Sequence, residues 1–376
     1  MKKRILAVLL CMATIFSVAA CGNGNKNNTE GGVQVTEPTL KKLATFDNLE
    51  EVFKGDYEVT DKVMAEGFAS LLTNVGVGVE WVKVTDRDTV EEGDIVNIDY
   101  TGYLDDKPFD GGAAKDQWIN VKNNCAVDEL TAADSTGFID GFTKGLVGAK
   151  VGETVKHDVT FPENYGSTEL AGKLTTFEFK INGIYTYKTH TLETINDEFV
   201  VKNFKETYEL STVEELKAYV KETLTYSALF SYIVDNSEYD IADDYVEFRL
   251  DTFVKYQEET LKSMYGDSMT LDTYLAYVYG STLKEIRPSW KEVIKSQIEF
   301  ELIYEGLVKE YKLELDEKAA EEYILSNLGD KATDADVEDY YKYVGAGVAE
   351  KGKAYIINQT AVKELLMTKL GFEEAK

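Results

Sequence analysis

The chain has 376 residues, and its 40 Lys and Arg against 68 Asp and Glu give a formal net charge of −28. A chain this acidic repels phosphate backbones, so nucleic acid is excluded as a partner. The length allows two or three domains. Of the three cysteines, Cys11 and Cys21 fall near the N-terminus. Cys125 is left alone, so no internal disulfide is expected.

The N-terminus has the pattern of a secretion signal. Cations at positions 2–4 precede an apolar run, Ile5–Phe16, which is too short to span a bilayer of ~30 Å. We therefore expect a signal peptide over residues 1–20. The sequence VAAC, ending at Cys21, resembles the bacterial lipobox. That resemblance implies a diacylated Cys21 and a stable membrane anchor outside the cytoplasm; cleavage after Ala20 without a lipid is the alternative.

The next two segments differ in pattern. Residues 21–45 are rich in Gly, Asn and Thr without periodicity, which predicts a flexible tether. Residues 46–90 contain one helical pattern, VTDKVMAEGFASLLTNV over 59–75, with Thr60 or Asp61 as its cap. Its apolar stripe consists of Val63, Phe68, Leu71 and Leu72.

In the remainder of the chain, the spacing of apolar residues changes once, from a strand-like to a helical period. Residues 91–187 alternate apolar and polar side chains in IVNIDYTGYL, KHDVTF and LTTFEFKING, which predicts a small antiparallel sheet domain. Residues 188–376 have helical spacing, with capping boxes predicted at 211–214 and 282–285. The fold class is therefore α+β, with a sheet domain followed by an all-α domain.

Six short motifs lie in order across the sheet domain. They resemble the FKBP-type peptidyl-prolyl isomerase family, and most closely the isomerase domain of trigger factor. The motifs are DYTG (99–102), PFD (108–110), FIDGF (138–142), GAKVGE (148–153), FPENYG (161–166) and FEF (177–179).

The resemblance extends to both flanks. Residues 46–90 are similar to the linker arm of trigger factor, and 188–376 to its C-terminal chaperone domain, which is of the SurA-like helical type. It covers residues 46–372, and the family's ribosome-docking domain has no counterpart there. The resemblance implies a foldase for unfolded or newly exported polypeptides, without a ribosome partner.

The resemblance also implies a site for X–Pro segments. Rotation about an X–Pro bond crosses a barrier of ~18–20 kcal/mol, and an apolar cradle for the twisted amide lowers it without cofactor or metal. Phe142 is expected as the floor, the Ile139 N–H and Tyr165 hydroxyl as donors to substrate carbonyls, and Asp110 as a residue that orients the rim through hydrogen bonds. The full expected set is Tyr100, Phe109, Asp110, Phe138, Ile139, Phe142, Tyr165 and Phe177.

Two stretches depart from the family pattern. Residues 122–137 are longer than the turn expected there and could cover or plug the site. The segment after Tyr165 is short, with Leu170 as its apolar contact. A holdase that binds without catalysis therefore stays open. A solute-binding lipoprotein is disfavoured because such proteins alternate strands and helices. Two histidines on separate segments, His157 and His190, offer no base or metal spacing.

Tyrosine is concentrated in the helical region. The tyrosines at 274, 277 and 279, like those at 340, 341 and 343, cannot all face inward on one helix. Some of them must therefore be exposed, and we expect these to line a surface that binds client polypeptides. Crowded packing between helices is the alternative.

Overall fold

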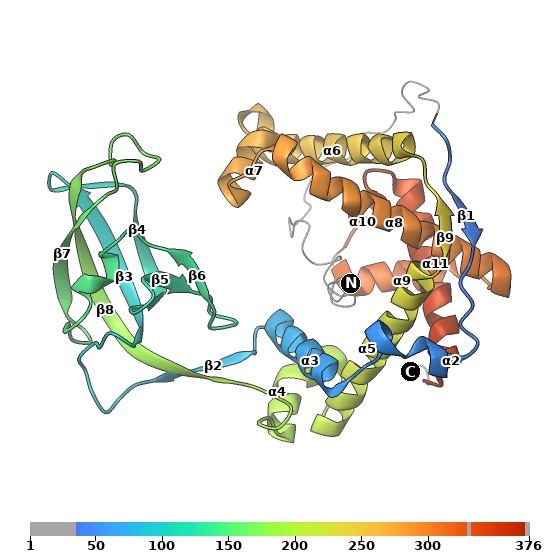
Figure 1. Cartoon of the computed structure of the whole chain (residues 1–376), viewed down its shortest axis with the longest axis horizontal. Helices are drawn as coiled ribbons and strands as arrows, with labels where there is room; N and C mark the ends of the chain where they lie inside the picture. The colour runs from blue at the N-terminus through green and yellow to red at the C-terminus, as the bar shows by residue number, and fades with distance from the viewer. Residues whose placement is uncertain (1–34, 329–331, 373–376) are drawn as a thin grey trace. The chain divides into compact units, whose positions relative to one another are not determined.

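The computed structural model describes residues 35–328 and 332–372. The predicted signal peptide, Cys21 and the first part of the tether lie outside these residues. The chain divides into two compact units (Figure 1). Residues 61–220 form the sheet unit. Among the described residues, 35–60, 221–328 and 332–372 form the helical unit.

The sheet unit contains one antiparallel sheet in the order β2-β8-β3-β4-β5-β6, with β7 paired to β8 (Figure 1). Three helices, α3, α4 and the short 3-10 helix η2, accompany it. The bounds are α3 Asp61–Val75, β2 Val79–Lys83, β3 Ile95–Leu104, β4 Lys107–Asn120, β5 Cys125–Val127, β6 Asp134–Gly137, η2 Phe142–Gly145, β7 Thr154–Thr160, β8 Leu174–Thr189 and α4 Asp197–Tyr208.

The period-two pattern accounts for strand β8. Thr175, Phe177, Phe179 and Ile181 are buried, whereas the residues between them are half-buried or exposed, because successive side chains of a strand point to opposite faces. The three predicted strand stretches lie in β3, β7 and β8, with Phe161 just beyond the end of β7. In α3, Phe68 and Leu72 are buried, and Val63 and Leu71 are half-buried.

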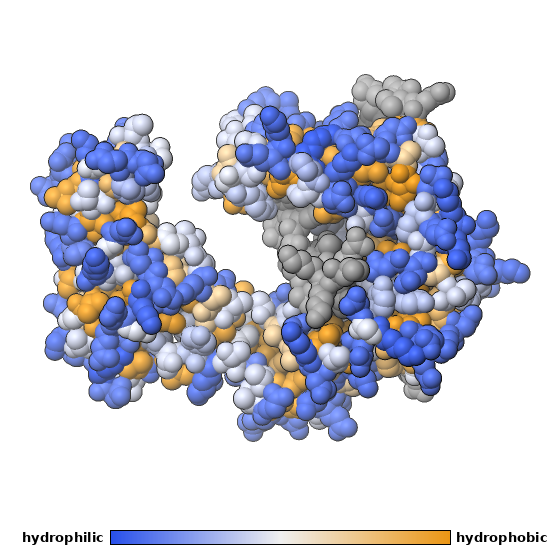
Figure 2. Space-filling model, viewed as in Figure 1, coloured by the Kyte–Doolittle hydropathy of each residue, from blue (hydrophilic) through white to orange (hydrophobic). Residues whose placement is uncertain are grey.

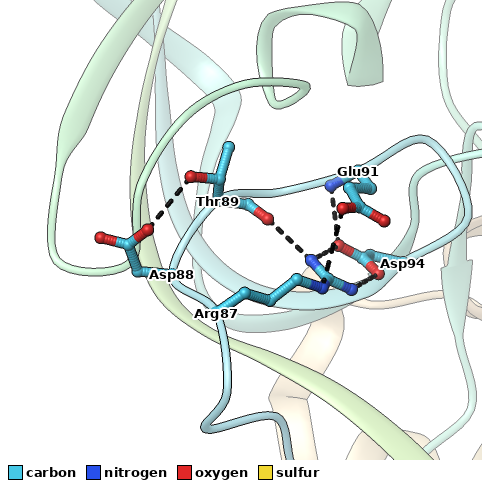
Figure 3. Close-up of polar contacts among 5 residues, drawn as sticks. All are labelled: Arg87, Asp88, Thr89, Glu91 and Asp94. Atoms are coloured by element: carbon cyan, nitrogen blue, oxygen red, sulfur yellow. Dashed lines mark hydrogen bonds and ion pairs between the residues drawn. The ribbon is translucent and has the colours of Figure 1, made fainter.

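A polar cluster fixes the loop that leads into β3 (Figure 3). The nearly buried Asp94 carboxylate accepts hydrogen bonds from both terminal nitrogens of Arg87, at 2.7 Å from Nη1, and from the Glu91 N–H at 2.7 Å. Arg87 also donates to the Thr89 carbonyl at 2.7 Å. Thr89 pairs with Lys150 in the segment after η2. The cluster therefore ties the start of β3 to the segment that follows η2.

The helical unit is built on long helices and one short two-stranded sheet. Figure 1 shows them in chain order from blue to red. The bounds are β1 Thr39–Lys42, α2 Leu49–Val52, η1 Gly55–Tyr57, α5 Val213–Asp235 (which begins in the sheet unit), β9 Glu238–Asp240, α6 Asp243–Tyr265, η3 Gly266–Ser268, α7 Leu271–Tyr279, α8 Leu283–Tyr311, α9 Glu317–Leu328, α10 Asp334–Val344 and α11 Ala349–Leu370.

These elements confirm the α+β class, and the helical unit differs from the all-α expectation by its β1–β9 ladder. Its helix α8 carries the predicted capping box, in which Thr282 and Glu285 cap each other's backbone. The box predicted at 211–214 is wrong by one residue. Thr212 accepts from the Glu215 N–H, and the Glu215 carboxylate accepts from the Thr212 N–H.

The last part of the predicted flexible tether, from residue 39, is structured, which corrects the prediction. Residues 39–42 form β1, which pairs with β9 at Leu40 and Tyr239, and Ala44 and Phe46 are buried. A Cβ on Gly306 of α8 would lie 2.4 Å from Leu40 Cδ2, so this glycine makes room for the segment. The chain thus packs into the helical unit from residue 39, within the span predicted to be flexible.

The predicted linker arm, residues 46–90, is likewise divided. Its first part, through Tyr57, belongs to the helical unit, where Val52 is buried in the core. Its second part contains α3 and strand β2, which pairs with β8 from Val79 to Lys83. The arm is therefore not a separate body.

Hydrophilic residues cover much of the face in view in Figure 2, in keeping with the abundance of charged residues. Inside the helical unit, buried Arg249 makes a bidentate ion pair with Glu301 at 2.8 and 2.9 Å and donates to the Gly345 carbonyl at 3.2 Å. Within residues 35–328 and 332–372, none of the helices combines the length and apolar character needed to cross a membrane.

Candidate functional site

Phe142 is the centre of a cluster of aromatic rings on the sheet unit. It is the first residue of η2 and is 2% exposed. Its ring stacks on Phe138 at 4.4 Å between centroids. Tyr100, Phe177 and Phe179 meet it edge to face at 5.0–5.2 Å. Such edge-to-face contacts stabilise ring pairs beyond their buried area, so Phe142 is held in an apolar cluster, and its role as the floor of a substrate site stays a prediction.

Phe177 and Phe109 extend the floor along the sheet. Phe177 of β8 is buried, and the half-buried Phe109 of β4 meets it edge to face at 5.8 Å. Space for these rings comes from two glycines. A Cβ on Gly102 would lie 2.5 Å from Phe109 Cζ, and one on Gly112 would lie 2.4 Å from Phe109 Cε2. The motif DYTG contains Gly102, but its packing role could not be predicted from the sequence.

Tyr165 stands at the exposed edge of the cluster. It is 40% exposed, and its ring lies 4.6 Å from that of Phe161. Pro162 begins the turn, and its carbonyl accepts from the Tyr165 N–H at 3.0 Å, so this corner sets the position of the tyrosine. Burial, and secondarily the charge of Tyr165, raise the pKa of Tyr100. The hydroxyl of Tyr100 therefore stays protonated at neutral pH.

Ile139 and Asp110 differ in how well they match their expected roles. Ile139 is half-buried against the same core. Within the described part of the chain its N–H donates no hydrogen bond, and its role as a donor to a ligand stays a prediction. Asp110 is exposed, and its side chain makes no hydrogen bond or ion pair with another described residue. The hydrogen-bonding rim role predicted for Asp110 is therefore wrong in this structure.

The long stretch 122–137 extends the sheet. Its β5 pairs with β4 through Asn120 and Cys125, and β6 pairs with β5. Among the described contacts, the stretch touches the aromatic cluster through one residue, Asn124, which hydrogen-bonds the backbone of Phe138. These contacts give no support to the covering or plugging of the site that the length of the stretch suggested.

Two further side chains belong to the core. Leu170, expected as an outer apolar contact, is 8% exposed and packs in the core under the cluster. Burial, together with a hydrogen bond to Asp134, raises the pKa of the Cys125 thiol. A thiol with a raised pKa is a poor nucleophile at neutral pH. Cys125 is therefore a structural residue.

The tyrosine prediction is confirmed at one of its two places. At the end of α7, Tyr277 is 87% exposed and Tyr279 49% exposed. Along α10, Tyr341 is buried, and burial raises the pKa of Tyr340 to about 12. Tyr265 at the end of α6 and Val278 are also exposed, at 46% each. Exposed aromatic and apolar side chains therefore lie at both ends of α7, with Tyr277, Val278 and Tyr279 at its C-terminal end.

Family comparisons define the class of each unit. Residues 86–183 match the family model described as FKBP-type peptidyl-prolyl cis-trans isomerase. Residues 201–366 match the model described as bacterial trigger factor protein C-terminus. The chain therefore contains an FKBP-type isomerase domain followed by a trigger factor C-terminal domain.

Relatives over nearly the whole chain give the family. The trigger factor of Clostridium tetani is 32% identical over 359 residues, which cover 88% of this chain and 73% of that protein. The trigger factor of Acetivibrio thermocellus is 29% identical, covering 84% of this chain and 70% of that protein. This chain belongs to the trigger factor family.

The shared length varies among these relatives. The match to the trigger factor of Caldicellulosiruptor bescii, 31% identical, covers 69% of this chain and 58% of that protein. A solved structure titled "Promiscuous Substrate Recognition in Folding and Assembly Activities of the Trigger Factor Chaperone" has a TM-score of 0.33 and 17% identity, covering 89% of this chain and 79% of that one.

Proposed function

We propose that this chain is a lipid-anchored foldase that acts outside the cytoplasm as a peptidyl-prolyl cis-trans isomerase and chaperone. The observation that carries the isomerase part is the convergence of the predicted aromatic residues on Phe142. The buried rings of Phe142, Phe177 and Phe179 form its floor, and the half-buried rings of Tyr100, Phe109 and Phe138 pack against them. An apolar surface of this kind favours the twisted amide, whose nitrogen has lost conjugation, over the planar ground state.

The catalytic test is a protease-coupled assay on the purified full chain. The probe is a peptide with an apolar residue before proline, because Phe138, Ile139 and Phe142 offer apolar contacts. We expect the wild type to accelerate cis–trans exchange and Phe177→Ala to lose most of that acceleration while keeping its circular dichroism spectrum. A wild type that leaves exchange at the uncatalysed rate would rule out the isomerase and leave the holdase.

The chaperone part rests on the exposed side chains at the C-terminal end of α7. Tyrosine offers a large contact area at a small cost in rotamer entropy, which suits binding of unfolded polypeptides. The test is aggregation of a refolding protein in the presence of the full chain. Replacing both Tyr277 and Tyr279 by serine should weaken the protection. The matched control is Tyr187→Ser, since Tyr187 is 42% exposed in the sheet unit. Equal protection by all three proteins would exclude this surface.

The location rests on sequence alone. The lipobox-like VAAC supports an anchor at Cys21, with membrane contact through the lipid only. Clients would then be newly exported polypeptides and their X–Pro segments, and no ribosome or nucleic acid enters the proposal. Fractionation of cells after labelling with a fatty-acid probe tests the anchor directly.

A further inference from the structure

Asn124 stands between the added β5–β6 hairpin and the aromatic cluster. Its φ of 51° lies in the left-handed region, which asparagine adopts more readily than most residues. From there its backbone carbonyl accepts from the Phe138 N–H at 2.9 Å. The position of Asn124 therefore turns its side chain and its carbonyl toward the loop that carries Phe138 and Ile139.

The Asn124 side chain uses its full hydrogen-bonding capacity on that loop. Its Nδ2 donates to the carbonyls of Phe138 and Ile139 at 3.0 and 3.1 Å. Its Oδ1 accepts from the N–H and the hydroxyl of Thr143, both at 3.1 Å. An amide has two donors and two acceptor lone pairs, so all four are occupied. These contacts enclose Phe142 from both sides along the chain.

The neighbouring asparagines serve another purpose. Nδ2 of Asn120 donates to Asp134 at 2.8 Å, and Nδ2 of Asn123 donates to the same carboxylate. Both therefore hold the hairpin to itself and to β4. Their hydrogen bonds do not reach residues 138–143 in the described structure. Of the three asparagines, Asn124 is the one committed to the cluster.

The hydrogen bond from Asn124 to the Phe138 carbonyl also orients the peptide unit between Phe138 and Ile139. In a planar trans peptide, the carbonyl and the following N–H point in opposite directions. Because Asn124 holds the Phe138 carbonyl, the Ile139 N–H points away from Asn124, and it has no acceptor among the described residues. We propose that Asn124 is a positioning residue that fixes the Ile139 N–H as a donor to a carbonyl of the X–Pro substrate.

The inference rests on the proposed isomerase function, and Asn124→Asp tests it. The change is isosteric and keeps an acceptor for Thr143, but it removes both donations and places a carboxylate beside two carbonyls. The Ile139 N–H would bind planar and twisted substrate alike, so its misplacement should raise KM about three- to tenfold with little change in kcat. The matched control, Asn123→Ala, loosens the hairpin next door and should leave both parameters unchanged.

Hydrogen exchange of the full chain gives a readout independent of activity. Asn124→Asp should speed exchange of the amides of Phe138, Phe142 and Thr143, and Asn123→Ala should not. If Asn124→Asp does not fold, Asn124→Gly replaces it, because glycine accepts a φ of 51° without strain.

The outcomes separate failure of the Asn124 inference from failure of the proposed isomerase function. An active Asn124→Asp protein with wild-type KM would overturn the inference, and so would equal effects of Asn124→Asp and Asn123→Ala. If the wild type lacks isomerase activity, the proposed function fails. The exchange measurement then decides whether Asn124 orders residues 138–143, and unchanged exchange would overturn that as well.

Discussion

A methyl group on Gly102 is a sharp probe of the aromatic cluster. In Gly102→Ala the new Cβ would lie 2.5 Å from Cζ of Phe109 and 2.7 Å from Cε1 of Phe177, whereas carbon atoms in contact prefer about 3.5–4.0 Å. The buried Phe177 has no free space, so the half-buried Phe109 ring is the one that must turn outward. Overpacking of this kind costs about 1–3 kcal/mol.

The displaced ring also changes the site. With Phe109 turned out, water reaches the Phe177 ring, and the advantage that the apolar surface gives to the twisted amide falls. We therefore expect a lower urea midpoint, followed by near-ultraviolet circular dichroism, and a lower kcat/KM for isomerisation. Gly166→Ala is the matched control, because its Cβ meets no atom within 4 Å. Wild-type stability together with wild-type isomerisation in Gly102→Ala would refute the packing argument.

Further expectations concern the rim, the hairpin and the anchor. Tyr165→Phe should reduce kcat/KM by about one hydrogen bond, ~0.5–1.5 kcal/mol. Asp110→Ala should stay within about twofold of wild type, since the exposed carboxylate holds nothing in place; a loss as large as that of Phe177→Ala would contradict this. Hydrogen bonds from Asn123 and Asn120 lower the pKa of Asp134. These hydrogen bonds therefore stabilise the fold above the pKa of about 3.9 that Asp134 has in the unfolded chain. The stabilisation is lost as pH falls through the lower pKa of Asp134 in the folded protein. Asp134→Asn should flatten this acid dependence in urea unfolding, and an unchanged pH slope would exclude the role. Cys21→Ala should release the protein from membranes or leave it unprocessed, and a membrane-bound mature form would count against the lipid.

The features predicted from sequence are those with a local physical signature. The alternation through Phe177, Phe179 and Ile181 is enough to predict which side chains of β8 are buried. Thr282 and Glu285 were recognisable as a cap because a capping box depends on spacing alone. The aromatic residues of the site were placed by their order within the family motifs, and the structure brings them into one cluster.

Other features depend on tertiary contacts that no local pattern encodes. The apolar residues of the segment 39–53 are spaced among polar ones, so burial of Phe46 against helices more than 150 residues away was not visible in the sequence. Asp110 was assigned hydrogen bonds by analogy, but its partners depend on how β4 faces its neighbours. Asn124 gave no signal, because its left-handed φ and its four side-chain contacts arise only after the hairpin forms.

The most direct test of the central claim is two-dimensional exchange NMR of a proline-containing peptide mixed with a catalytic amount of the full chain. The method reads interconversion of cis and trans signals without a coupling protease. If the cluster around Phe142 is an isomerase site, wild-type protein should produce exchange cross-peaks on a timescale far shorter than the tens of seconds of the uncatalysed reaction, and Phe177→Ala should remove most of their intensity. Peptide signals that stay free of exchange even with equimolar wild-type protein would contradict the account.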